Sequence, residues 1–336
     1  MKNIIFFGLF IITLVALTGC DWYAAERIIY EDWLCTVNTD GTDLTYIRES
    51  VGRHFVVTPD SERVILFGTS HIYSMNIDGS NFNTLNDSVG NSWGSSSPSI
   101  DETPEGTKIV FLYNTDIYQL DLESNEITNI TNTQDIFEFY PCYSNNGTQI
   151  VYTTKKDSII TVSTMDYNGA NNDIVVEYKN PTLDCSYFMF PSFSIDGEKI
   201  FYIWYGDSTC KIDRGLYSNN IGDSTNHFLF EGSLPFGISM PADGSKIVFY
   251  NNDNHIYIMN EDGSNLSDLG DADYYRPVIS SDGSEIFFAK LSHIYIINSN
   301  GSGRRQLIDN SLNDYCKTIT FLPDNRVMCS VQRRMR

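Results

Sequence analysis

The chain has 336 residues, of which 43 are acidic and 22 basic, giving a formal net charge of −21 at pH 7. This balance argues against a nucleic-acid partner, because binding to phosphates needs clustered lysine and arginine. Beyond the first twenty residues no second apolar run is long enough to span a bilayer. A closed all-β fold can form a single domain of this length.

The N-terminal segment has the pattern of a bacterial lipoprotein signal peptide. Lys2 supplies the positive charge, residues 4–17 are almost uncharged, and Leu17-Thr18-Gly19-Cys20 follows. This last motif resembles the lipobox of bacterial lipoproteins. The resemblance implies cleavage before Cys20, so that residues 1–19 are the signal peptide, and lipidation of the Cys20 sulfur and amino group. An uncleaved anchor helix is the alternative.

Lipidation would place the protein in the bacterial cell envelope, on the extracytoplasmic side of a membrane. Several acyl chains hold a protein on a bilayer far more firmly than one chain. Residues 20–32 are then the lipidated cysteine and a short tether. Asp21 often signals retention in the inner membrane in enterobacteria, but other phyla read this position differently, so the membrane and the leaflet stay open.

One motif occurs in two clear copies, at residues 72–81 (IYSMNIDGSN) and 256–265 (IYIMNEDGSN). It combines a strand-forming run with an Asp-Gly turn, which supplies the positive φ that tight hairpins need. Self-similarity of this kind is typical of folds built from stacked repeats. Looser copies occur at residues 34–41, 117–121, 162–169, 216–219 and 294–301.

A second motif alternates with the first. It consists of a Pro/Ser-rich approach, an Asp-Gly or Asn-Gly turn and a β-branched or aromatic run, as in residues 191–202 (PSFSIDGEKIFY). Its turn glycines recur at a spacing of about 40 to 50 residues, which is the length of a four-stranded propeller blade. The copies fall at residues 59–66, 98–111, 141–152, 191–202, 243–249, 277–288 and 323–328.

The order of the two motifs predicts how the ring closes. The chain begins with an isolated Ile-Tyr half and ends with an isolated Asp-Gly half, so we expect the two halves to complete one blade. The prediction is an all-β protein, a β-propeller of seven four-stranded blades over residues 33–331, whose last blade is shared by both ends of the chain. Six blades are the alternative, if the weak repeat at Leu216 or the first half-repeat forms no blade. Residues 332–336 would form a basic C-terminal tail.

The two motifs resemble the TolB-like propeller repeats, a WD-repeat-like family of bacterial envelope proteins, over nearly all of residues 33–331. The resemblance implies a β-propeller and little about activity, because propellers carry many unrelated functions. The chain differs from TolB in having no α/β domain ahead of the propeller and in its lipidation motif. The role of TolB in the Tol–Pal system is therefore not transferred.

No catalytic residues or cofactors are predicted. Residues 90–94 match Gly-x-Ser-x-Gly, but a nucleophile elbow must open a helix, and Ser95-Ser96-Ser97-Pro98 cannot start one. No metal site is predicted either. His71, His255 and His293 precede the Ile-Tyr pair at equivalent repeat positions, so we expect them at the start of the third strand in three different blades, away from the central channel.

Cysteine usage suits an oxidising compartment, since six cysteines remain beside Cys20. Cys35 and Cys329 fall on the third and second strands of the shared blade, within one residue of facing each other. Two states of this pair stay open: a disulfide that closes the ring, or two buried free thiols.

These features favour a membrane-tethered, non-enzymatic binding scaffold whose partner is a protein or an envelope glycan. The rival is a carbohydrate-active enzyme, because some propellers of related repeat type resemble oligogalacturonate lyases, which use a channel metal held mainly by histidines. Aromatic and arginine side chains are favoured interface anchors, although aromatics in this fold are often core residues. The candidates for a binding face are Trp93, Trp204, Tyr205, Tyr274, Tyr275 and Arg276.

Overall fold

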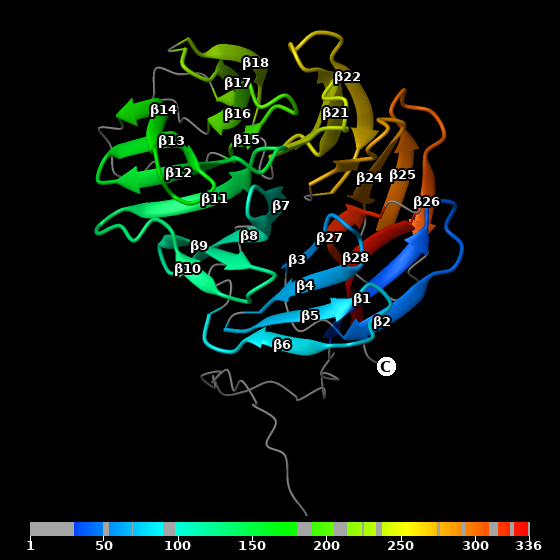
Figure 1. Ribbon diagram of the computed structural model, residues 1–336. Coiled ribbons are helices and arrows are strands. Elements are labelled where there is room, and N and C mark those ends of the chain that lie inside the picture. Colours follow the sequence, from blue (N-terminus) through cyan, green and yellow to red (C-terminus); the bar gives the residue numbers. More distant parts are fainter. Residues whose placement is uncertain are drawn as a thin grey trace, which may run out of the picture.

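The computed structural model describes residues 30–49, 54–68, 70–89, 98–179, 190–204, 214–223, 225–232, 237–273, 276–290, 293–308, 315–322 and 326–334. These residues form seven antiparallel sheets of four strands each, and none of them forms a helix. The sheets are arranged as blades around a common axis (Figure 1). The first strands of neighbouring blades contact one another, so they are the inner strands of the ring. The predicted seven-bladed propeller is thereby confirmed, and the six-bladed alternative is wrong.

The strands are named here from the inner to the outer strand of each blade. Blade 1 consists of β3 (His54–Val57), β4 (Arg63–Phe67), β5 (Ile72–Asn76) and β6 (Asn83–Asn86). Blade 2 consists of β7 (Ser99–Thr103), β8 (Gly106–Tyr113), β9 (Asp116–Asp121) and β10 (Ile127–Asn129). Blade 3 consists of β11 (Phe137–Tyr143), β12 (Gln149–Lys156), β13 (Ile159–Asp166) and β14 (Asp173–Lys179). Blade 4 consists of β15 (Ser192–Phe193), β16 (Lys199–Trp204), β17 (Gly215–Asn220) and β18 (His227–Glu231).

The remaining blades continue the same order. Blade 5 consists of β19 (Ile238–Ser239), β20 (Lys246–Asn251), β21 (His255–Asn260) and β22 (Ser267–Asp271). Blade 6 consists of β23 (Val278–Ile279), β24 (Glu285–Lys290), β25 (His293–Asn298) and β26 (Arg305–Ile308). Blade 7 consists of β27 (Tyr315–Phe321), β28 (Arg326–Arg334), β1 (Tyr30–Asn38) and β2 (Thr45–Glu49).

Blade 7 joins the two ends of the chain, as the order of the motifs predicts. Its strand order is β2-β1-β28-β27, and β1 pairs with β28 along its whole length, from Tyr30 opposite Arg334 to Asn38 opposite Arg326. The two strands extend three residues beyond the expected 33–331 range at each end, because they continue to pair there. The ring therefore has no open sheet edge where the chain ends meet.

The two faces of the ring carry different kinds of connection. Antiparallel strands reverse direction at every turn, so the first-to-second and third-to-fourth turns of all blades lie on one face. We call it the hairpin face. The second-to-third and fourth-to-first connections lie on the opposite side, the connection face. Because β28 is a second strand and β1 a third strand, Arg334 and Tyr30 lie at the connection face.

The Asp-Gly-Ser sequence closes the third-to-fourth hairpins for a physical reason. Asp78 Oδ1 accepts hydrogen bonds from the Ser80 backbone N–H (2.9 Å) and hydroxyl (2.6 Å), which hold the pKa of Asp78 below its usual value. Gly79 has a φ of 85°, and a Cβ there would lie 2.5 Å from Cγ2 of Ile47 in the neighbouring blade. Only glycine fits both the conformation and the space.

Apolar side chains fill the space between adjacent blades. One such cluster joins blade 6 to blade 7 through Phe287, Ile294, Val37 and Val327, all fully buried. Each blade contributes its Ile-Tyr and Ile-x-Phe runs to clusters of this kind, so the repeated motifs form the core. None of the residues that the structure describes lies in a helix long and apolar enough to cross a membrane.

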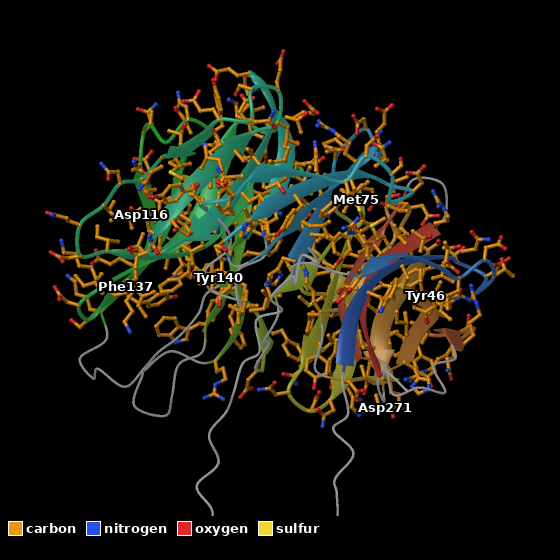
Figure 2. The ribbon with its side chains drawn as sticks, turned by 90° about the horizontal axis from the view of Figure 1, so that it is seen from below. Tyr46, Met75, Asp116, Phe137, Tyr140 and Asp271 are labelled. Atoms are coloured by element: carbon orange, nitrogen blue, oxygen red, sulfur yellow. The ribbon has the colours of Figure 1, made fainter. Side chains whose placement is uncertain are left out.

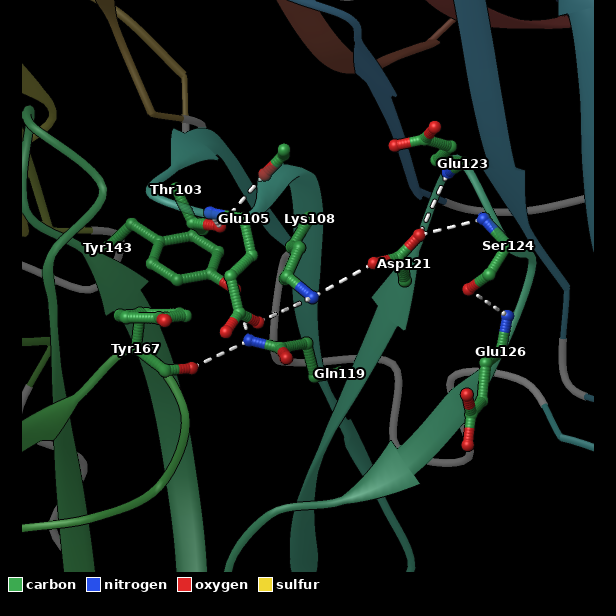
Figure 3. A network of polar contacts seen from close by, with 11 residues as sticks. Thr103, Glu105, Lys108, Gln119, Asp121, Glu123, Ser124, Glu126, Tyr143 and Tyr167 are labelled. Atoms are coloured by element: carbon green, nitrogen blue, oxygen red, sulfur yellow. Dashed lines mark hydrogen bonds and ion pairs between the residues drawn. The ribbon is translucent and has the colours of Figure 1, made fainter.

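A polar network ties blade 2 to blade 3 near the hairpin face (Figure 3). The buried Lys108 ammonium contacts Asp121 Oδ2 at 2.9 Å and Glu105 Oε2 at 3.6 Å. Gln119 Nε2 donates to the Tyr143 hydroxyl (2.8 Å) and to the Tyr167 carbonyl oxygen (2.7 Å) of the next blade. Buried polar groups of this kind are stable only when their partners are in place.

Candidate functional site

The inner strands place a ring of small side chains around the axis of the propeller. Each member pairs with the middle residue of the apolar run on the second strand, as Ser192 pairs with Phe201. Two serines tie neighbouring blades together, because Ser99 Oγ accepts from the Tyr143 N–H (3.1 Å) and Ser239 Oγ accepts from the Ile279 N–H (3.2 Å). The ring consists of Val56, Ser99, Cys142, Ser192, Ser239, Val278 and Thr320.

Arg276 stands at the connection-face end of this ring. It directly precedes the proline that leads into β23, and its Nη2 donates a hydrogen bond to the Ile238 carbonyl oxygen on the inner strand of blade 5. Burial lowers the pKa of the guanidinium, and the thiol of Cys142, three blades away, is near enough to act on it electrostatically. Arg276 nevertheless remains exposed to solvent. A side chain that is surrounded by protein and still meets solvent is expected to project toward the axis.

No carboxylate pairs with Arg276 within the described part of the chain. Arginine stays protonated at any physiological pH, so a lowered pKa does not discharge it. The result is a positive charge on an exposed residue, without a carboxylate partner among the described residues, in a protein of net charge −21. Guanidinium groups in this state bind carboxylate, phosphate or sulfate through charge-assisted hydrogen bonds.

Two aromatic rings of blades 3 and 4 pack against each other, one within β11 and one two residues before β15. The Tyr140 and Phe190 ring centroids are 4.2 Å apart, and each residue directly precedes a proline, Pro141 inside β11 and Pro191 just before β15. In Figure 2, Tyr140 lies nearer the middle of the disc than Phe137, which begins the same strand. Gly237 completes the contact with blade 5, because a Cβ there would lie 3.3 Å from the Phe190 Cβ. We call Tyr140, Phe190, Gly237 and Arg276 the axial site.

Tyr140 has a strained backbone. Its φ is +53°, and the pairing of β11 with β12 shifts register between Phe139 and Cys142. A bulky residue rarely adopts positive φ, and such a conformation costs on the order of 1–3 kcal/mol. The bulge sets the Tyr140 ring against Phe190. Strain of this kind is more frequent at functional sites than elsewhere.

Two titratable groups lie further along the inner strands. Burial raises the pKa of Asp101 on β7 to about 6, with a further increase from the neighbouring Glu102 charge, against a backbone hydrogen bond that lowers it. Burial also raises the pKa of the Cys142 thiol, which Ser99 contacts at 3.9 Å. Cys142 is therefore a thiol at neutral pH, and neither group is hydrogen-bonded to an activating base among the residues that the structure describes.

The predicted histidine positions are confirmed. His71, His255 and His293 lie at the start of the third strands of blades 1, 5 and 6. His71 Nδ1 contacts Ser70 Oγ at 2.9 Å, and His255 Nδ1 contacts Asp268 Oδ2 at 2.8 Å. Across the described ranges, no group of three or more histidine, cysteine or acidic side chains is arranged to hold a metal ion.

The predicted binding-face residues divide into three groups. Arg276 lies in the axial site. Trp204 requires a correction, because its side chain is 2% exposed and stacks on Tyr178 with ring centroids 4.2 Å apart, so it belongs to the core between blades 3 and 4. Four candidates lie outside the described residues, together with the lipidation site and the Gly-x-Ser-x-Gly motif: Trp93, Tyr205, Tyr274, Tyr275, Cys20 and residues 90–94.

The strand ends that flank those four candidates all lie on the connection face. Trp93 falls between β6 and β7, Tyr205 between β16 and β17, and residues 274–275 between β22 and β23. The sequence analysis did not single out Tyr140 and Phe190. A signal for them exists, because each directly precedes a proline, as Arg276 does, although Pro141 lies inside β11 rather than before it.

Comparison with solved structures supports the same architecture. An oligogalacturonate lyase in complex with manganese superimposes with a TM-score of 0.67 at 10% identity, over 92% of this chain and 96% of that one. An oligogalacturonate lyase from Vibrio parahaemolyticus gives 0.63 at 10% identity, over 91% and 96%. A TolB-like protein from Agrobacterium tumefaciens gives 0.52 at 13% identity, over 92% and 99%.

The chain shares the propeller fold with all three. At 10–13% identity the likeness extends to the fold alone. No family model matches the sequence, and no curated protein matches it. Neighbours that range from a TolB-like protein to lyases leave the activity to be argued from the site itself.

Proposed function

We propose that this protein is a membrane-tethered, non-enzymatic binding scaffold of the bacterial cell envelope, which binds a protein or an envelope glycan at its connection face. The observation that carries the proposal is the guanidinium of the solvent-exposed residue Arg276, which has no carboxylate partner among the described residues. The axial site anchors the ligand, and the surrounding connections provide the rest of the contact surface.

The chemistry of the axial site suits binding. The Arg276 guanidinium offers N–H donors to a carboxylate, phosphate or sulfate, and its desolvation by the surrounding protein strengthens such a bond. Phe190, which is half-buried, provides rigid apolar surface on which a sugar ring or an apolar side chain can pack, and the buried Tyr140 ring packs against it. Arginine and tyrosine are also the residue types that dominate binding energy in protein interfaces.

The position of the chain ends is consistent with a tether on the same side. Cys20 is separated from Tyr30, the first described residue, by residues 21–29, and the chain between the two spans at most about 35 Å when extended. Tyr30 lies at the connection face of blade 7. A lipid on Cys20 would hold the rim of the connection face within that reach of the membrane, so the ligand would be presented at or near the bilayer surface.

The proposal can be tested with two matched arginine variants. Arg276→Met removes the axial charge, and Arg305→Met removes a charge on β26 that already pairs with Glu285 at 3.0 Å. Residues 30–336 of each protein would be immobilised and exposed separately to solubilised membrane proteins, peptidoglycan and surface polysaccharide from the producing cells. We expect one fraction to bind wild type and Arg305→Met alike, and Arg276→Met at least about tenfold more weakly.

Two outcomes would contradict the proposal. One is equal binding by Arg276→Met and Arg305→Met, or binding of no fraction by wild type. The other is turnover, since a lyase is the rival activity. Metal analysis and an assay on acidic oligosaccharides would be run on the same preparation. A stoichiometric divalent ion together with cleavage would establish a carbohydrate-active enzyme in place of a scaffold.

A further inference from the structure

Cys35 and Cys329 are direct register partners in the blade that closes the ring. Cys35 lies on β1 and Cys329 on β28, and 294 positions separate them in the chain. Their sulfur atoms are 2.9 Å apart, and Cys35 Sγ lies 3.5 Å from the Cys329 carbonyl oxygen. Both side chains are fully buried, within the cluster that joins blade 7 to blade 6.

The equivalent position in the other blades shows that this pair is specific to blade 7. Where blade 7 has Cys35 opposite Cys329, five other blades place a tyrosine of the third strand opposite a large apolar or aromatic residue of the second strand. Both members of the pair are cysteine only in the blade that is made from the two chain ends. The corresponding pairs are Tyr73–Leu66, Tyr118–Phe111, Tyr217–Tyr202, Tyr257–Phe249 and Tyr295–Phe288.

The backbone geometry permits a covalent bridge. Directly opposed residues of an antiparallel pair have Cα atoms about 4.5–5.5 Å apart, which falls within the range of about 4.4–6.8 Å seen for disulfides. Cys35 and Cys329 occupy such positions in uninterrupted pairing, because no register shift occurs between β1 and β28. No strand has to move for the bond to form.

We propose that Cys35 and Cys329 form a disulfide in the exported protein, so that the propeller is closed by a covalent bond. The two thiols lose two protons and two electrons to a protein disulfide of an extracytoplasmic thiol oxidase, which is reduced to its dithiol while the sulfur–sulfur bond forms. The bond forms as β1 and β28 pair, before the side chains are sealed in the core. The proposal is independent of the axial site and shares with the proposed function only the export of the chain.

The bridge would link residues near the two ends of the propeller. In the entropic account, a disulfide that closes so long a loop restricts the unfolded chain strongly. For a chain of this size we expect the bridge to raise the melting temperature by about 5–10 °C.

The experiment uses the full chain, exported by its own leader and purified without reductant after alkylation of free thiols in denaturant. Peptide mapping by mass spectrometry should recover the Cys35 peptide linked to the Cys329 peptide. Alkylated Cys35 and Cys329, or a bridge from either to another cysteine, would overturn the proposal. The Cys35→Val/Cys329→Val double variant should melt about 5–10 °C lower than wild type, whereas Cys142→Ser, which removes the half-buried thiol on β11, should retain the bridge. Binding of the envelope fractions would be measured on the same sample to separate the two proposals. A bridged protein that binds none of them contradicts only the scaffold function.

Discussion

Val37 in the third strand of blade 7 pairs with Val327 in its second strand, although almost the whole described chain separates them. Both side chains are fully buried against blade 6. The last blade therefore exists only when the two ends of the chain meet, and blades 1 and 6 each lose a neighbour if they do not.

The first prediction concerns this closure. A variant that lacks residues 33–47, and with them most of β1 and part of β2, should lose cooperative folding of the whole ring rather than one strand. Removal of β1 exposes the edge of β28 and the apolar cluster beneath it. Thermal unfolding followed by circular dichroism is the measurement, with a chain that starts at residue 30 as the control. A truncated protein that melts like this control would show that blade 7 is dispensable.

The second prediction concerns the Lys108–Asp121 pair between the second and third strands of blade 2. Lys108→Met leaves Asp121 with its backbone donors Glu123 and Ser124 but removes a buried cation, and should lower the free energy of unfolding by about 1–3 kcal/mol. The half-exposed pair of Lys199 and Glu261, also 2.9 Å apart, is the matched control.

Lys199→Met should cost less than about 1 kcal/mol, because exposed ion pairs contribute little. Urea denaturation of both variants measures the difference. Equal losses in the two variants would mean that burial does not strengthen the Lys108 pair.

The third prediction concerns pH and Glu138. Its buried carboxyl accepts hydrogen bonds from the Ile117 N–H (3.0 Å) and from the hydroxyls of Thr131 and Thr133 (2.5 and 3.1 Å). Burial outweighs these bonds and raises its pKa from 4.5 to about 7, with a smaller contribution from the Asp116 charge. Between these two values the folded protein keeps a proton that the unfolded chain has released, so stability should decrease as the pH rises.

Glu138→Gln removes this titration. The variant should lose the part of the decline in stability between pH 4.5 and pH 7 that Glu138 causes, which amounts to about 3 kcal/mol at most. Melting temperatures of both proteins across that window are the measurement. A difference between wild type and variant that stays constant from pH 4.5 to 7 would contradict the assignment.

The sequence was sufficient to predict the architecture because the same two motifs recur along the chain at nearly regular spacing. Asp-Gly turns and Ile-Tyr runs recur in every blade with small changes, and the half-repeats at the chain ends predict the shared blade. The register of Cys35 and Cys329 was expected to within one residue, and the structure places them directly opposite each other.

Residues that depart from the repeat were harder to predict. Trp204 follows a strand run like the others, and only contacts across the blade interface show that it packs on Tyr178. Arg276 was a candidate for a general exposed surface, whereas its bond to Ile238 depends on the distance between two inner strands. Pro141 inside β11 is a sequence signal for the bulge, but it does not predict the positive φ of Tyr140.

The fourth prediction concerns the N-terminus. We expect the mature protein to begin at Cys20 and to carry acyl chains, so that Cys20→Ala yields protein that is soluble or retains residues 1–19. Mass spectrometry of protein extracted from membranes decides this directly. An intact Met1, or cleavage at another position without added acyl mass, would contradict the lipoprotein assignment.

The central claim is that the axial site binds the ligand through Arg276. The most direct measurement is NMR of the arginine side-chain Nε–Hε signals of residues 30–336 during titration with the envelope fraction that binds. Arg276 should shift with the binding curve while Arg305, paired with Glu285, stays unchanged. Saturable binding with no change in the Arg276 signal would contradict the claim.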